Sequence, residues 1–473
     1  MKKIFFLVGF ITVFFFSACA QNGQKEKIDV IETKVVQFFN EQNIDGLYSL
    51  AGEKFKKQLS AEVFKAVCEN NLFPLGNIKL VEFEQNDKGI SKYKTTFETA
   101  ILSMYLGLDS AGKLETFLFQ PYKKPVNGQV KKIITDNPMA TELDKKIDNI
   151  LQPFMNESKT VGLSIGILKD GKTTFYNYGE TKKENGQVPS SKNLYEIGSI
   201  TKTFTGLLLA KAVVENKINL NDPVNKYLGK DIPVIRFGND TLKIVHLANH
   251  SSGLPPLPDN FGATDLVNPY KDYDDAKLYA YLKVAKVSRK PGVKFEYCNL
   301  AVGLLGNILE RVNKMSFEKM VKDFICSHAG MTDTKQLLNK KDSTLFMQGY
   351  DDNILPQSQW DFKALAAAGC LRSNTEDMLR YAVLQSGTTA ANLQNAITLS
   401  HQPTFDVSQQ KIALNWFIQN WGWGEILFHG GQTGGYKSFL AINPKTKNAV
   451  ILLANTAVTN DEAGVKILQY LDK

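Results

Sequence analysis

The sequence contains few cysteines and histidines, five of each among 473 residues. No C-x-x-C pair is present and the cysteine spacings are long and irregular, so we expect neither a disulfide framework nor a metal site. The formal charge of +8 comes from lysines scattered among acids. This pattern argues against a nucleic-acid partner. No internal repeat or low-complexity stretch is evident. The length of 473 residues predicts two or three domains, and the 43% of hydrophobic residues is enough to bury sizeable cores, so we expect a globular protein. We find no motif that calls for a cofactor.

The N-terminus differs in character from the rest of the chain. Lys2 and Lys3 precede an apolar run, residues 4–16, which is too short for a typical membrane-spanning helix and ends in small residues. Residues 1–18 therefore read as a bacterial secretory signal, and Cys19 stands where a lipid would be attached. Ordinary cleavage near Ala20 is the alternative. We expect residues 19–27 to be a polar tether and the protein to be lipid-anchored in the cell envelope, facing the periplasm or the cell surface.

Residues 28–136 predict a small α+β domain. Helical apolar spacing comes first, and strand signals follow at residues 78–83, 93–106, 114–119 and 130–134. Helices before a meander of strands favour helices packed on one face of a curved antiparallel sheet, similar in pattern to cystatin-like or nuclear-transport-factor-2-like folds. We find no set of residues there that indicates chemistry.

A second domain is predicted from residue 140 to 473, after a turn cluster at 136–138. An amphipathic helix behind Thr141 is followed by two strands joined through Asp170-Gly171, a strong hairpin signal. Strands return only near the end, at residues 424–429, 435–442 and 449–455, before a last helix. Strands at both ends of a mainly helical stretch indicate one sheet assembled from distant segments.

Ser199 is the candidate nucleophile. It stands where an extended approach meets an apolar helix, and Lys202 follows three residues later on the same face, close enough to assist loss of the hydroxyl proton. The helix start adds N–H groups that favour developing negative charge. Four other S-x-x-K spacings occur, but only the Ser199 copy opens a long apolar helix. The interpretation therefore depends on partners elsewhere.

Two further stretches offer those partners. Tyr297 and Asn299 form the chain's only Y-x-N, directly before an apolar helix. A tyrosine is a poor base unless a cation such as Lys202 stabilises its phenolate. The third stretch is His429-Gly430-Gly431-Gln432 at the end of a strand, where glycines allow close backbone approach to a ligand. A packing tyrosine, a capping asparagine and a turn are the structural alternatives.

In this order, the three motifs resemble those of the serine β-lactamase and penicillin-binding-protein superfamily, in the branch of class C β-lactamases, D-alanyl-D-alanine carboxypeptidases and related esterases. The supporting matches are residues 220–224, 247–255, 330–334 and 368–373. The resemblance covers residues 140–473 and implies an α/β domain: an antiparallel β-lactamase/transpeptidase-like sheet flanked by helices, with an all-helical insertion. The small α+β cystatin-like domain precedes it and lies outside the resemblance.

The resemblance implies roles for these residues. Ser199 would be acylated, Lys202 and Tyr297 would share its proton, and Asn299 would orient a substrate amide. The N–H groups of Ser199 and Gln432 would form the oxyanion hole, within a substrate-binding stretch that includes His429 and Gly431. We expect an exported serine hydrolase acting through an acyl-enzyme.

Two departures from the pattern guide the expected substrate. His429 stands where efficient class C β-lactamases carry lysine. Because histidine is mostly neutral at pH 7, anion binding should be weaker here. Cys298 replaces a frequent serine. The substrates expected are D-amino-acid peptides, such as peptidoglycan-derived ones, or esters; the alternatives are a class C-type β-lactamase and a non-catalytic periplasmic peptide-binding or sensing protein. The oligomeric state is open.

Overall fold

The computed structural model divides the chain into two compact units, residues 1–127 and 128–473, which are described separately. The first expected domain is 28–136 and the second begins at 140. The structure describes residues 21–87, 89–122, 132–387, 391–408 and 410–473. The predicted signal peptide, 1–18, and Cys19 lie outside these ranges. None of the helices described is both long and apolar enough to cross a membrane.

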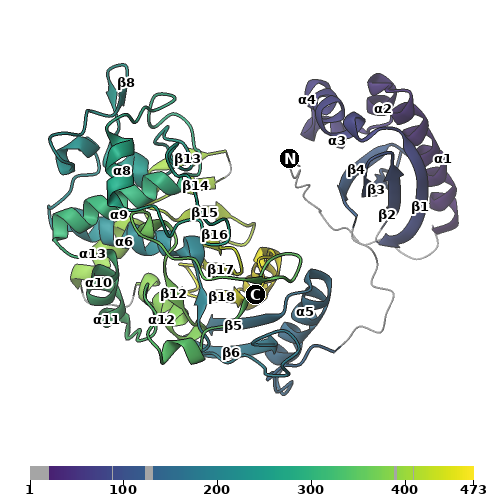
Figure 1. Ribbon diagram of the computed structural model, residues 1–473. Helices are drawn as coiled ribbons and strands as arrows, with labels where there is room; N and C mark the ends of the chain where they lie inside the picture. Colours follow the sequence, from purple (N-terminus) through teal and green to yellow (C-terminus); the bar gives the residue numbers. More distant parts are fainter. Residues whose placement is uncertain (1–20, 88, 123–131, 388–390, 409) are drawn as a thin grey trace. The chain divides into compact units, whose positions relative to one another are not determined.

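The described part of the first unit contains four α-helices followed by a four-stranded antiparallel sheet in the order β1-β2-β3-β4 (Figure 1). Its elements are α1 (Gln21–Asn40), α2 (Ile44–Ser49), α3 (Glu53–Gln58), α4 (Ala61–Val67), β1 (Ile78–Asp87), β2 (Ile90–Phe97), β3 (Ile101–Leu108) and β4 (Leu114–Pro121). Residues alternate between half-buried and buried along β2, as expected of a strand with one face covered. The Phe39 ring of α1 packs edge-on against the Phe97 ring of β2, with ring centroids 5.4 Å apart. The helices therefore cover one face of the sheet, as predicted.

Three local expectations in this region differ from the structure. The single strand predicted over 93–106 is two strands, because residues 98–100 form a tight turn in which Phe97 N donates to Ala100 O. No strand forms over 132–134, the described part of the one predicted at 130–134; Ile133 instead exchanges backbone hydrogen bonds with the side chain of Gln152. Helix α1 already begins at Gln21, so most of the expected tether is helical.

The second unit is built on an eight-stranded antiparallel sheet in the order β13-β14-β15-β16-β17-β18-β5-β6. The strands are β5 (Gly162–Lys169), β6 (Lys172–Gly179), β13 (Phe405–Val407), β14 (Gln410–Ile412), β15 (Phe417–Asn420), β16 (Glu425–Gln432), β17 (Lys437–Ile442) and β18 (Ala449–Ala454). Strand β5 pairs with β18, so early and late segments of the unit share one sheet, as the sequence predicts.

Helices cover both faces of this sheet (Figure 1). Side chains of β18 alternate between two cores: Leu452 packs with α5 (Glu142–Ser158) and α14 (Asp461–Leu471), and Leu453 packs with α6 (Thr201–Val214) and α12 (Thr375–Gln385). Every residue of β18 is buried for this reason. The predicted Thr141 cap of α5 is confirmed as part of a capping box with Asp144.

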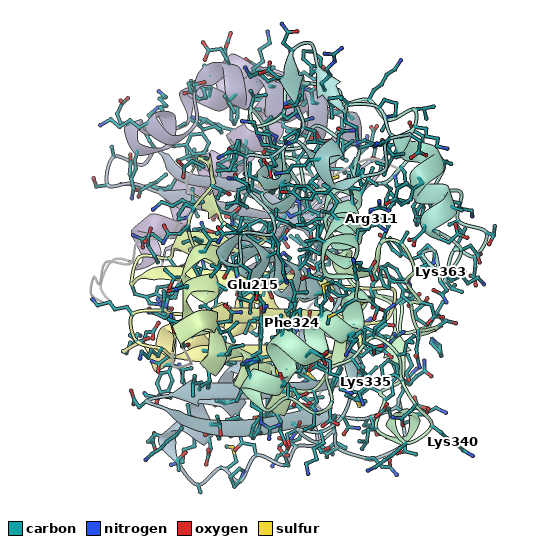
Figure 2. All side chains as sticks on the ribbon, turned by 90° about the vertical axis from the view of Figure 1, so that its left-hand side faces the viewer. Glu215, Arg311, Phe324, Lys335, Lys340 and Lys363 are labelled. Atoms are coloured by element: carbon teal, nitrogen blue, oxygen red, sulfur yellow. The ribbon has the colours of Figure 1, made fainter. Side chains whose placement is uncertain are left out.

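The stretch between β6 and β13 is mainly helical and irregular, as expected. Besides α6 and α12, it holds α7 (Ile244–Ala248), α8 (Asp275–Leu282), α9 (Asn299–Asn313), α10 (Phe317–Val321), α11 (Ser327–Ala329) and α13 (Ala391–Ser400), with short two-residue strands that include β7 (Tyr195–Glu196) and β12 (Arg372–Ser373). Helix α6 is buried along almost its whole length and ends at the surface near Glu215, which pairs with Lys211, and near Phe324 (Figure 2). The N-terminal end of α6, directly after Ser199, therefore lies inside the second unit.

Candidate active site

Ser199 lies in a short 3-10 turn, Gly198–Ile200, between β7 and α6, and its side chain is half-buried. Gly198 has a φ of +47°, and a Cβ on it would lie 2.8 Å from the backbone N of Gln432. Glycine is needed here because the chain adopts a left-handed conformation while it passes directly against β16. This approach brings Ser199 and Gln432 into the lining of one pocket.

Lys202 is the residue most clearly shaped by burial. Its side chain is fully buried, and its Nζ donates to Ser199 Oγ at 3.0 Å and to the carbonyl O of Ala368 at 2.6 Å. Burial lowers the pKa of this amine to about 7, because both hydrogen-bond partners are uncharged. A substantial fraction of Lys202 is therefore a neutral amine near pH 7, able to accept a proton from Ser199.

Tyr297 completes the group around the serine. The Lys202 Nζ lies 4.9 Å from the centroid of its ring. Burial raises the pKa of the phenol above its usual value, and the hydrogen bond with Ser199 offsets this only in part. Tyr297 is therefore a neutral phenol rather than the lysine-stabilised phenolate considered from the sequence. A neutral phenol is suited to donating a proton.

Two buried histidines flank Tyr297. The ring of His250 lies 4.4 Å from the Tyr297 ring, centroid to centroid, and that of His429 lies 6.4 Å away. Burial and the nearby Lys202 hold the pKa of His250 well below its usual value and lower that of His429 to about 3. Both imidazoles are therefore neutral at pH 7.

The hydrogen bonds of these rings identify their tautomers. His250 Nδ1 accepts from the backbone N–H of Cys298 at 3.2 Å, which leaves the ring proton on Nε2. His429 Nδ1 lies 2.6 Å from the carbonyl O of Gly430 and must donate to it, which leaves Nε2 unprotonated. Each Nε2 is buried and has no hydrogen-bond partner among the described residues. His429 thus offers the site an acceptor, where a lysine would offer a cation.

Asn299 begins helix α9 and lines the pocket beside Ser199. Its Nδ2 donates to the Tyr270 hydroxyl at 3.3 Å, whereas its Oδ1 is buried without a partner and can accept from a bound amide. No charged side chain belongs to the lining of this pocket, which consists of described residues. The full lining is Gly198, Ser199, Tyr270, Asn299, Trp360, Phe362, Ala368, Gly369, Gln432 and Thr433.

Strand β16 borders the pocket with a partly open edge. Its pairing with β15 ends at Phe428, so residues 429–432 extend past the end of that neighbour. Gly431 packs so closely against the preceding loop that a Cβ on it would lie 2.0 Å from Ile197 O. The Ser438 hydroxyl also donates to Ile197 O, at 2.8 Å. These contacts fix the edge of β16 beside Ser199, as the predicted oxyanion hole requires.

The sequence interpretation missed Glu196, which lies three residues before the nucleophile. Glu196 is buried, accepts from Trp360 N at 2.7 Å and lies 3.5 Å from the Arg372 guanidinium. Burial raises the pKa of its carboxyl to about 7, although Arg372 acts to lower it. This pair ties β7 to β12 and to the Trp360 side of the pocket. The glutamate has no partner nearby in sequence, so no motif could indicate it.

Two sequence motifs that the sequence analysis did not mention form neither a metal site nor a phosphate-binding site in the described residues. His246 and His250 have metal-ligand spacing, but no group of three metal-ligating side chains occurs among the residues described. Gly166, Gly171, Lys172 and Thr173 fit a phosphate-loop pattern. They lie in the β5–β6 hairpin, whereas such a loop requires a following helix.

The structure therefore brings Ser199, Lys202, Tyr297, Asn299 and Gln432 together, with His429 next to Tyr297. Gly431 supports the strand from behind and does not line the pocket. A serine whose hydroxyl is bonded to a neutral buried amine and to a phenol, in a mixed α/β fold of this kind, defines a serine hydrolase.

The chain belongs to the beta-lactamase family, whose pattern it matches over residues 147–472. It is 25% identical over 371 residues to a beta-lactamase of Pseudomonas fluorescens, covering 71% of this chain and all of that one. It is 27% identical to protein flp of Staphylococcus aureus, covering 71% of this chain and 66% of that one.

Solved structures show the same fold. A beta-lactamase/D-alanine carboxypeptidase from Pseudomonas syringae superposes with a TM-score of 0.63 at 25% identity, over 70% of this chain and 99% of that one. A D-alanine carboxypeptidase from Burkholderia cenocepacia gives 0.60 at 24% identity, over 69% and 99%. The predicted family and fold class are confirmed, and the non-catalytic alternative is set aside.

Proposed function

We propose that this serine hydrolase is exported and acts, through an acyl-enzyme on Ser199, on D-amino-acid peptides or esters that place a small uncharged group in the pocket. The observation that carries the proposal is the neutral His429, together with a pocket lining free of charged side chains. A substrate whose reacting part carries a carboxylate gains no ion pair from these groups. Peptidoglycan fragments whose scissile D-amino-acid amide has no free carboxylate beside it belong to the proposed class; a terminal D-Ala-D-Ala carries such a carboxylate and should react more slowly than an uncharged amide or ester.

In the proposed acylation step, the neutral Lys202 takes the Ser199 proton as Oγ attacks the carbonyl carbon. The N–H groups of Ser199 and Gln432 stabilise the oxyanion, and Asn299 Oδ1 accepts from the substrate amide. Tyr297 gives its proton to the leaving group as the carbonyl–leaving-group bond breaks. The Lys202 ammonium then returns a proton to the phenolate, and the site is neutral again.

In the proposed deacylation step, water attacks the ester on Ser199 from the Tyr297 side. The buried acceptor His429 Nε2 supports this direction, because it has no partner and can hold a water in place. The neutral Lys202 takes a proton from this water as the water oxygen bonds to the carbonyl carbon, and gives it to Ser199 Oγ as the carbonyl–Oγ bond breaks and the acid product leaves. The enzyme is then ready for another cycle.

We further propose that Cys19 carries a lipid that holds the protein in the cell envelope. The support is the charged start, the short apolar run and the Ser17-Ala18-Cys19 ending of residues 1–19. The test is fractionation of cells that express the wild type or Cys19→Ala. The wild type should sediment with membranes and take up labelled palmitate, and the variant should do neither.

The test of the activity is intact-mass spectrometry of residues 21–473, wild type and Ser199→Ala. Each is incubated separately with a penicillin, a D-Ala-D-Ala peptide and p-nitrophenyl acetate, and hydrolysis is followed in parallel. Adducts and turnover should occur with the peptide or the ester and vanish in Ser199→Ala. Faster turnover of penicillin than of the other two would contradict the proposed substrate class in favour of a class C-type β-lactamase.

Variants at His429 test whether the neutral side chain at this position determines the substrate. For His429→Lys, we expect the ratio of the acylation rate with penicillin to that with p-nitrophenyl acetate to rise about tenfold. One charged hydrogen bond of moderate strength gives an effect of this size. His429→Gln stays neutral and should leave that ratio near the wild-type value. Equal ratios in both variants would show that charge at this position does not select the substrate.

A further inference from the structure

The loop 249–256 lies along the segment that carries Tyr297. Four of its carbonyl oxygens accept hydrogen bonds from residues spaced along that segment. The pairs are Gly292 N to Ser251 O at 2.8 Å, Glu296 N to His250 O at 2.8 Å, Cys298 Sγ to Pro255 O at 3.1 Å and Leu300 N to Pro256 O at 3.1 Å. The loop therefore sets the path of the chain on both sides of Tyr297.

Within this loop, His250 holds Tyr297 from three directions. Its carbonyl O accepts from the residue before the tyrosine, Glu296, at 2.8 Å. Its Nδ1 accepts from the residue after it, Cys298, at 3.2 Å. Its ring lies 4.4 Å from the phenol ring at an interplanar angle of 30°. The N–H groups of both neighbours of Tyr297 and the Tyr297 ring thus contact one residue.

The backbone of His250 is adapted to this position. Its φ is +59°, in the left-handed region, and its side chain is 1% exposed. Histidine and asparagine are among the side chains that tolerate this conformation, whereas most others are disfavoured there. The chain thus keeps an unusual backbone conformation where it directs an imidazole against Tyr297.

We propose that His250 is a positioning residue that fixes the phenol of Tyr297 against Ser199 and Lys202. The proposal rests on the assignment of Tyr297 as the proton donor. Proton transfer needs hydrogen-bond reach, and misplacement of a group by about 1 Å can cost roughly 100-fold in rate. His250 does not line the pocket, so its loss should act through Tyr297 and not through substrate contact.

The test is the variant His250→Asn, made in residues 21–473. Asparagine tolerates the positive φ, and its Oδ1 can take the place of Nδ1 as acceptor for Cys298 N, while the ring that packs against Tyr297 is lost. We expect kcat for an amide substrate, a D-Ala-D-Ala peptide, to fall about 10- to 100-fold with KM within about threefold of the wild type, because its amine leaving group must receive a proton from Tyr297. The matched control is His401→Asn: His401 is half-buried, and burial lowers its pKa to about 4, but it contacts Gln385 and Trp416 away from the pocket. This control should keep the wild-type kcat.

A double variant separates positioning from general destabilisation. In a Tyr297→Phe background the phenol hydroxyl is absent, so His250→Asn should slow labelling of Ser199 by a fluorophosphonate by less than twofold. The adduct accumulates, and labelling therefore remains measurable at low activity. An equal fold-loss in both backgrounds, or a His250→Asn enzyme with wild-type kcat, would overturn the proposal. Wild-type activity in Tyr297→Phe alone would instead overturn the assignment of Tyr297.

Discussion

The Nζ of Lys202 lies 3.0 Å from Ser199 Oγ and 2.6 Å from Ala368 O, and neither partner carries a charge. An ammonium ion at this fully buried position would lose its hydration without gaining an ion pair. The neutral amine is the favoured form for that reason, and burial lowers the pKa to about 7. The same burial that makes Lys202 costly to charge makes it available as a base.

Replacement of Lys202 should abolish most of the activity. Lys202→Met fills a similar volume without an amine, and we expect kcat/KM for p-nitrophenyl acetate to fall about 10²- to 10⁴-fold. Lys211→Met, on the same helix, is the control: Lys211 pairs with Glu215 at the surface and should be dispensable. Similar activity of the two variants would remove Lys202 from the mechanism.

The pH dependence of acylation should show one ionisation near neutrality. Lys202 must be unprotonated, so the rate of acylation should rise about tenfold per pH unit below about pH 7 and level off above it. His429, with its pKa lowered to about 3, should add no step between pH 4 and 8. Stopped-flow measurement of the p-nitrophenol burst gives the profile. A fall in rate as pH rises through 7 would exclude a neutral lysine base.

Two adjacent glycines of β16 should respond differently to alanine. A Cβ on Gly431 would lie 2.0 Å from Ile197 O, a backbone atom that cannot move freely, whereas a Cβ on Gly430 meets its nearest neighbour at 3.7 Å. We expect Gly431→Ala to lower the free energy of unfolding by about 2–4 kcal/mol and Gly430→Ala to change it by less than about 0.5 kcal/mol. Urea unfolding followed by tryptophan fluorescence compares them; equal stabilities would mean that the strand is free to shift.

Glu196 should make stability fall as pH rises. Its pKa is about 7 in the folded chain and near 4.5 in the unfolded chain, so the folded state binds more protons between these values. The free energy of unfolding should therefore decrease from about pH 4.5 to about pH 7, by up to roughly 3 kcal/mol from this group. Glu196→Gln should flatten that decrease when thermal unfolding is compared across this range. An unchanged slope in the variant would show that Glu196 titrates normally.

The sequence predicted the parts of the site that depend on local chemistry. Ser199 and Lys202 share a helix turn, and Tyr297 and Asn299 adjoin another helix start, so their relative placement follows from helical geometry. The protonation state of Tyr297 could not be predicted in this way. It depends on burial by His250, Phe417 and other residues far apart in the chain, and burial is a property of the folded core.

The fold was predictable to a similar extent. Hairpin chemistry at Asp170-Gly171 and the Thr141 cap located β5, β6 and α5 correctly. The turn at residues 98–100 contains neither glycine nor proline, so two strands were predicted as one. The buried contact of Glu196 with Arg372 joins residues of the nucleophile turn and of a distant loop, and no periodic pattern encodes such a pair.

The pairing of β5 with β18 has a consequence for how the protein is made. Gly162 N donates to Asn455 Oδ1, 293 residues further along the chain, beside the strand pair that holds the sheet together. During synthesis β5 emerges long before its partner exists, and contacts between such distant residues form slowly. The catalytic unit can complete its sheet only after nearly all of it has been synthesised.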